Sequence, residues 1–197
     1  MEKLLQNLKA KVIEKSKNPD FIHHAWFVDF HLLFVEKLAM ELCDIYKEAD
    51  KDIVFALVWI HDYAKILDKS REHEAEMLER SRELMMEIGF PVEFINKILE
   101  YLEIFESKMT VDLNIAPIEV KIASSSDAAS HLVGPFYSIY FWENPGKTVP
   151  ELVQSNRNKL IKDWNRKVVL PEVRKAFESK HSFMMEQTAD FPDKYFS

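Results

Sequence analysis

Four ionisable residues stand within apolar helical sequence, where a charged side chain is costly. His31 lies in HLLFVEKLAMEL, the pair His61-Asp62 ends the apolar run IVFALVWI, and Asp127 lies in KIASSSDAASHL. Taken singly, each is ordinary, since a lone histidine on an apolar helix face is more often structural than a ligand. A buried carboxylate without a partner, however, destabilises the fold. Two imidazoles and two carboxylates that converge would bind one divalent cation, and this mixture suits Mn, Fe, Co, Ni or Zn better than Ca.

Three further residues are candidates for substrate binding or proton transfer. Lys65 follows His61 by one helical turn and is either a phosphate-binding group in the same pocket or an exposed helix lysine without a role. His73 either binds phosphate, donates a proton or ligates a second metal, or it belongs to the solvated helix start REHEAE. Arg71, in the same segment, is a candidate for binding substrate anions.

The remaining histidines and the cysteine are given smaller roles. His23 and His24 either line the entrance to the site or are ordinary surface residues, whereas His131 and His181 are interpreted as structural or exposed. Cys43 lies in an apolar helix, and the sequence contains no GxSxG motif. Catalysis by a serine or cysteine nucleophile is therefore excluded.

The spacing of apolar residues predicts helices along most of the chain. Asp20 and Asp50 stand at positions of helix N-caps, and Gly89 is placed to end a helix. The segment FYSIYFWENPGKTVP is interpreted as an aromatic loop, which is either a lid over a nucleobase or a packing or oligomer contact. Helices are predicted over about 1–16, 21–46, 51–60, 71–88, 91–105, 117–132, 149–164 and 171–187.

Composition restricts the fold class. The chain has 197 residues, of which 47% are hydrophobic and 30% charged, so it can fill a sizeable core and is not disordered. Only 3 residues are glycine, which excludes a glycine-rich phosphate loop and argues against a sheet with many tight turns. We therefore expect an all-α protein, and the absence of repeats or flexible linkers predicts a single domain over residues 1–197.

Charge and targeting signals restrict the partners and the compartment. The net charge of -7 argues against binding a nucleic-acid polymer. The longest apolar run, Ile53 to Ile60, is too short to span a membrane, and the start MEKLLQNLKAKVIEK lacks the features of a signal peptide. A single cysteine suits a reducing compartment. These features predict a soluble cytoplasmic protein.

The order and spacing of the four residues resemble the H…HD…D signature of the HD-domain metal-dependent phosphohydrolase superfamily. The sequence His31-x3-Val35-x3-Ala39 is similar to the first motif helix of that family, and HDYAK resembles its HDxxK element. The resemblance implies a compact helical bundle with its core at about 20–135 and a C-terminal helical extension at about 136–197. It also implies metal ligands at His31, His61, Asp62 and Asp127, and catalytic groups at Asp62, Lys65 and His73.

The function implied by the resemblance is hydrolysis of a phosphate ester in a nucleotide or another small phosphorylated metabolite by a metal-activated water. Dinuclear members carry further histidines, and Tyr101 stands near one such position, which favours one metal per chain. The alternatives are an HD-type non-heme diiron oxygenase and a catalytically silent HD fold that binds a nucleotide or a partner. A homodimer is the default expectation for a helical protein this rich in aromatic residues.

Overall fold

The described part of the chain is helical, in agreement with the expected all-α class. The computed structural model describes residues 1–67, 74–107, 110–189 and 194, and these contain no strand. The α-helices are α1 (Glu2–Ser16), α2 (Leu33–Ile45), α3 (Lys51–Ile60), α4 (Tyr63–Leu67), α5 (Glu74–Ile88), α6 (Val92–Glu106), α7 (Ile118–Ser130), α8 (Phe136–Glu143), α9 (Val149–Lys162) and α10 (Pro171–Gln187). Two π-helical segments, η1 (Val28–Leu32) and η3 (Asp163–Lys167), and a 3-10 helix, η2 (Leu113–Ile115), complete the set.

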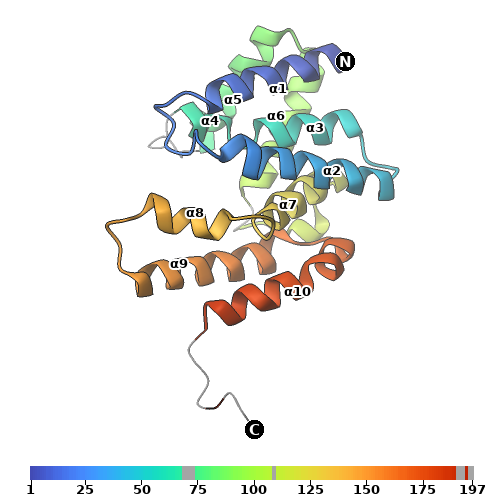
Figure 1. Ribbon diagram of the computed structural model, residues 1–197. Helices are drawn as coiled ribbons and strands as arrows, with labels where there is room; N and C mark the ends of the chain where they lie inside the picture. Colours follow the sequence, from blue (N-terminus) through green and yellow to red (C-terminus); the bar gives the residue numbers. More distant parts are fainter. Residues whose placement is uncertain (68–73, 108–109, 190–193, 195–197) are drawn as a thin grey trace.

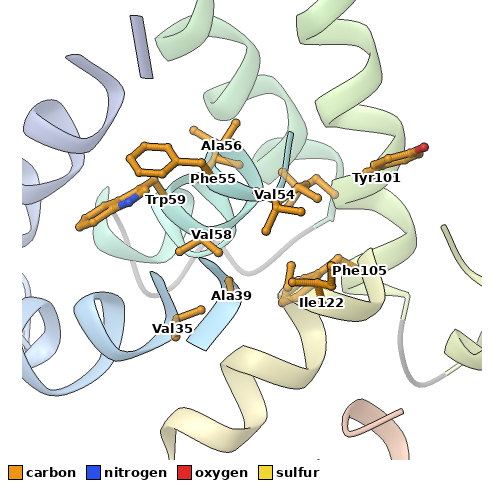
Figure 2. Packing of buried hydrophobic residues seen from close by; sticks show 14 of the residues in the cluster. Val35, Ala39, Val54, Phe55, Ala56, Val58, Trp59, Tyr101, Phe105 and Ile122 are labelled. Carbon is orange, nitrogen blue, oxygen red and sulfur yellow. The ribbon is translucent and has the colours of Figure 1, made fainter. Parts of the chain in front are cut away.

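Helix α3 is surrounded by other helices, as its uniformly apolar sequence predicts. Every residue from Val54 to Ile60 is buried. Figure 2 shows its side chains pointing in several directions, toward Val35 of α2, Phe105 of α6 and Ile122 of α7. Because burial fixes α3 on all sides, it also fixes the position of the residues that immediately follow it.

Helix α7 is the second buried element, and it packs against α2, α3, α6, α10 and η3. Its residues from Ile122 to Ser130 are all buried, and most are alanine or serine. Side chains this small allow neighbouring backbones to approach closely. The hydroxyl of Ser125 accepts hydrogen bonds from the backbone N–H groups of Val169 and Leu170, at 3.2 and 3.3 Å. These bonds attach the segment between η3 and α10 to α7.

Several helix ends lie where local sequence places them. The Asp50 carboxylate accepts hydrogen bonds from the backbone N–H groups of Asp52 and Ile53, as expected of the N-cap of α3. Helix α5 ends before Gly89, whose φ of +90° is readily adopted only by glycine. Helix α10 begins at Pro171, a residue suited to the first helical position because its N–H would lack a partner there.

Two sequence expectations were wrong. The predicted helix at 21–46 is divided: residues 21–26 form turns, and η1 precedes α2. Asp20 therefore caps no helix, and its backbone N–H donates to the side chain of Asn18. The expected aromatic loop forms α8 over Phe136–Glu143, because it packs against α9, and Phe136 packs against Trp26 in the turn before η1, once the chain folds back.

The helices of the C-terminal segment lie together at one end of the molecule. Figure 1 shows α8, α9 and α10, in orange and red, on the side of α7 that faces away from α1 and α5. One hydrophobic cluster nevertheless extends from Leu5 in α1 to Phe177 in α10. Among the described residues, no helix combines the length and the apolar character needed to cross a membrane.

Candidate metal centre

The structure brings His31, His61, Asp62 and Asp127 together. The Nε2 atom of His31 lies 3.6 Å from Oδ2 of Asp62 and 3.7 Å from Oδ1 of Asp127. The Nε2 atom of His61 lies 3.3 Å and 4.0 Å from the same two oxygen atoms. Both imidazoles are buried, with 2% and 3% of their surface exposed. Four residues separated by up to 96 positions therefore present their polar atoms to one point.

The four residues reach this point from three parts of the fold. His31 lies in the π-helical segment η1, a kind of distortion that is frequent at functional sites. His61 follows the last residue of α3, and Asp62 occupies the turn before α4. Asp127 projects from the buried helix α7. The elements that fix the site are therefore η1, the buried helices α3 and α7, and the turn that follows α3.

The two histidines are oriented by hydrogen bonds at Nδ1. The Nδ1–H of His61 donates to the carbonyl oxygen of Val58 at 2.8 Å. The hydroxyl of Ser130 donates to the carbonyl of Asp127, so it accepts from Nδ1–H of His31 at 3.0 Å. In the neutral form of each ring, the form that binds a metal, these partners place the proton on Nδ1 and leave a lone pair on Nε2. Each lone pair faces the two carboxylates, which are also acceptors.

This arrangement of acceptors suits a cation. Ligand atoms bound to a first-row divalent metal lie about 2.0–2.2 Å from it, which separates neighbouring ligands by roughly 3–4 Å. The observed separations of 3.3–4.0 Å match. The Nε2 atom of His61 is fully buried and has no hydrogen-bond partner within the described part of the chain. Buried histidine and aspartate groups here could therefore hold a metal ion.

Two lysines occupy the outer oxygen atoms of the carboxylates. The Lys65 ammonium lies 2.6 Å from Oδ1 of Asp62, and the Lys167 ammonium lies 2.7 Å from Oδ2 of Asp127. Each carboxylate thus has one oxygen on a lysine and the other toward the histidines. A carboxylate that bridges two metal ions through both oxygens would have to give up its lysine, so this pairing favours one cation.

The charges of the site determine the protonation of its members. Burial favours the neutral form of Asp62, but Lys65 and His61 outweigh it and hold the pKa of Asp62 well below its usual value. Burial acts in the same way on Asp127, and Lys167 with the nearby histidines holds its pKa low. Burial lowers the pKa of His61, but the two carboxylates more than compensate and raise it. The carboxylates are therefore ionised and create a potential that favours positive charge between them.

Four residues of this region were missed by the sequence analysis: His131, Lys159, Asp163 and Lys167. His131, taken there as structural or exposed, is buried with Nε2 3.6 Å from Oδ1 of Asp127. The buried Asp163 accepts from Nδ1–H of His131 at 2.8 Å and is 3.0 Å from the Lys159 ammonium. Burial, followed by the Lys159 charge, lowers the pKa of His131 to about 3, so its imidazole is neutral.

Part of this could have been found in the sequence. Asp127 and His131 stand four residues apart, a spacing that puts two potential ligands on one helix face. Lys159, Asp163 and Lys167 follow the same four-residue spacing. No local pattern, however, predicts that the second series packs against the first.

The candidate metal centre opens into a cavity of about 190 Å³. The three lysines and the aromatic rings of Phe27, Phe105 and Phe136 line this cavity together with the candidate ligands. A second cavity of about 340 Å³ adjoins it, since His23, Trp26, Phe136 and Lys159 line both. A small anion therefore has space beside the candidate ligands, and a larger group attached to that anion has space in the second cavity.

The remaining candidate residues named from the sequence differ in their position relative to the cavity. His23 lines the cavity and its Nδ1 lies 2.8 Å from Oε1 of Glu143, whereas His24 is exposed. His181 stacks on Trp164 away from the cavity. Arg71 and His73 lie outside the described residues. Comparisons of the chain with family models, with curated proteins and with solved structures give no match.

Proposed function

We propose that this protein is a metal-dependent phosphohydrolase that cleaves the phosphate ester of a nucleotide or another small phosphorylated metabolite. The observation that carries the proposal is the convergence of two imidazole Nε2 atoms and two carboxylates in a cavity that three lysines also line. The resemblance of His31, His61-Asp62 and Asp127 to the HD signature supports the same function.

The donor set assigns His31, His61, Asp62 and Asp127 as metal ligands. A bound divalent cation supplies Lewis-acid chemistry, by polarising a phosphoryl oxygen and lowering the pKa of a water nucleophile. Asp62 stays ionised because of Lys65, so it serves as an anionic ligand that orients its neighbours rather than as a strong base. His61 is held in the tautomer that ligation requires by the Val58 carbonyl.

The lysines are suited to the phosphate. Lys65 contacts Asp62, and its side chain is 36% exposed, so its ammonium can also bind a phosphate oxygen that enters the cavity. Lys159 is 37% exposed and lines both cavities, which places a positive charge where they meet. The rings of Phe27, Phe105 and Phe136 limit the access of water to the reacting group.

The organic part of the substrate is assigned to the second cavity. Trp26, Phe136 and Tyr140 supply aromatic surface there, and Glu143 and Asn156 supply polar groups. Two of these aromatic residues belong to α8, the segment interpreted from sequence as either a lid or a packing contact. Aromatic surface with a few polar groups is typical of pockets that bind a small organic ligand.

The test measures metal content and phosphate release on the same protein. The purified protein, freed of metal and reconstituted with Mn²⁺, is assayed on nucleoside monophosphates, sugar phosphates and phenyl phosphate. We expect about one metal ion per chain and a loss of activity of at least about 100-fold in Asp62→Asn and Asp127→Asn. Asp29→Asn alters an exposed aspartate two residues from His31 and serves as the matched control.

Each alternative predicts a different result. Two irons per chain in the protein as purified, before metal removal, would favour the diiron oxygenase and contradict the proposal. A bound metal with no phosphate release from any substrate class would favour a silent binding protein. Failure of the wild-type protein to bind any divalent metal would refute the metal centre itself.

A further inference from the structure

A third imidazole faces Asp127 at a distance similar to those of the two assigned histidine ligands. Nε2 of His131 lies 3.6 Å from Oδ1 of Asp127, compared with 3.7 Å for His31 and 4.0 Å for His61. The potential ligand atoms of His31, Asp127 and His131 all lie within 4.8 Å of one another. His131 is one helical turn beyond Asp127, on the same face of α7.

The contact between His131 and Asp127 is not a hydrogen bond. Its length of 3.6 Å exceeds the usual range, and the proton of the neutral ring is on Nδ1, where Asp163 accepts it at 2.8 Å. Nε2 therefore presents a lone pair to a carboxylate oxygen. As with the other two histidines, a cation between these atoms would turn two facing acceptors into two ligands.

The Nδ1 partner of His131 is of the kind that orients metal ligands. Metal-bound histidines commonly donate their second N–H to a carboxylate, which fixes the tautomer and the ring orientation. Asp163 provides this carboxylate, and it is itself held 3.0 Å from the Lys159 ammonium and 3.4 Å from that of Lys167. All of these partners come from α9 and η3, so the C-terminal segment completes the surroundings of this ring.

Two neighbouring rings also hold the ring of His131. It stacks with His31, with the ring centres 5.3 Å apart and the planes 15° apart. Phe136 packs against it with the ring centres 4.0 Å apart. The ring is therefore fixed with its lone pair toward the metal centre before any ion binds.

From these contacts we infer that His131 is a third imidazole ligand of the same cation and that Asp163 is its positioning residue. The inference rests on the proposed function, which requires a cation at this centre. It extends the ligand set to three imidazoles and two carboxylates, so that one position of an octahedron is left for water or substrate, instead of two.

The test counts ligands without using activity. Co²⁺ is loaded into the wild-type protein and into the variants His131→Ala and Asp163→Asn. The dissociation constant of Co²⁺ is measured by competition with a chelator. The imidazole ligands are counted by X-ray absorption. His181→Ala is the matched control, because His181 also packs on an aromatic ring, Trp164, but lies away from the cavity. Thermal unfolding monitored by circular dichroism verifies that each variant is folded.

We expect three imidazoles in the wild-type protein and two in His131→Ala. Asp163→Asn removes the charge that orients His131 and that also pairs with Lys159 and Lys167, but it leaves His131 in place. It should therefore keep three imidazoles and bind Co²⁺ about 10–100-fold more weakly. His131→Ala should weaken binding by at least as much, and His181→Ala should change neither quantity. If His131→Ala does not fold, the imidazole count of the wild-type protein and the affinity of Asp163→Asn decide the question.

The possible failures are distinguishable. Two imidazoles in the wild-type protein, or unchanged Co²⁺ affinity in both variants, would overturn the role of His131 and leave the four-ligand centre intact. Failure of the wild-type protein to bind Co²⁺ would overturn this inference together with the metal centre of the proposed function.

Discussion

Replacement of Lys167 by methionine tests the electrostatic balance of the centre. Lys167 is 6% exposed, and its ammonium lies 2.7 Å from Asp127 and 3.4 Å from Asp163. With an effective dielectric constant of about 20, unit charges at these distances attract by roughly 6 and 5 kcal/mol. Burying the ammonium offsets much of this attraction, because it removes several kcal/mol of hydration. Since the variant leaves two buried carboxylates without their shared partner, we expect a destabilisation of about 3–5 kcal/mol.

The assay is urea unfolding of metal-free protein at pH 7, with Lys37→Met as the control. Lys37 is 72% exposed and its nearest carboxylate, that of Glu41, lies 3.9 Å away, so the control should change stability by less than about 0.5 kcal/mol. A free energy of unfolding of about 5–15 kcal/mol is typical of a domain, which leaves room for the Lys167→Met variant to fold.

The pH dependence gives the prediction a second, signed test. Lys167 and the nearby histidines overcome the effect of burial and lower the pKa of Asp127 and of Asp163 in the folded protein. The stabilisation from these carboxylates is present above their unfolded pKa of about 4 and disappears as the pH falls through the lower folded values. Without Lys167 the two groups accept protons at a higher pH, and the neutral forms tolerate burial. The difference between wild type and variant should therefore shrink as the pH falls from 7 toward 4.

Either of two results would refute this reasoning. A destabilisation below about 1 kcal/mol at pH 7 would show that the carboxylates need no buried ammonium. A difference that grows as the pH falls would show that the carboxylates are not the groups that Lys167 stabilises.

Two further predictions concern the elements that position the site. Asp50→Ala removes the N-cap of α3 and should lower the free energy of unfolding by about 1 kcal/mol in urea titrations. Asp50→Asn keeps an acceptor oxygen and should recover most of this loss. Equal losses in the two variants would contradict the capping role. Ser125→Ala leaves the buried N–H of Leu170 and the partly buried N–H of Val169 without their acceptor and should cost about 1–3 kcal/mol in the same titrations. The control Ser138→Ala alters an exposed serine and should lower the free energy of unfolding by less than about 0.5 kcal/mol. An equally small loss in Ser125→Ala would mean that these hydrogen bonds do not attach η3 and α10 to α7.

Most of the helices could be predicted from the sequence, because helix formation depends on neighbours within a few residues. The apolar run Ile53 to Ile60 indicated a helix buried on all sides, and Asp50 and Gly89 indicated helix ends. The boundaries failed where packing overrides local preference. The aromatic segment beginning at Phe136 has little amphipathic pattern of its own and becomes helical where it packs against α9 and Trp26.

The candidate site was likewise predictable only in part from the sequence. The residue types of His31, His61, Asp62 and Asp127 within apolar helices indicated buried ionisable groups that need partners, and the resemblance to the HD signature implied that these four meet. Their distances, and the Nδ1 bonds that point each Nε2 inward, required the structure.

The sequence by itself determined the helical class, the burial of α3 and the position of His61-Asp62 at its end, since each follows from periodicity and turn-forming residues along a short stretch of chain. Only the tertiary structure decided that Asp163 would orient His131, 32 residues away, and that Lys167 would pair with Asp127, 40 residues away. The physical reason is that local sequence fixes which face of a helix is apolar but leaves many ways to join such faces. The small residues of α7 and the hydrogen bonds of Ser125 to the segment before α10 select the packing arrangement that brings Asp127 and His131 next to Asp163 and Lys167.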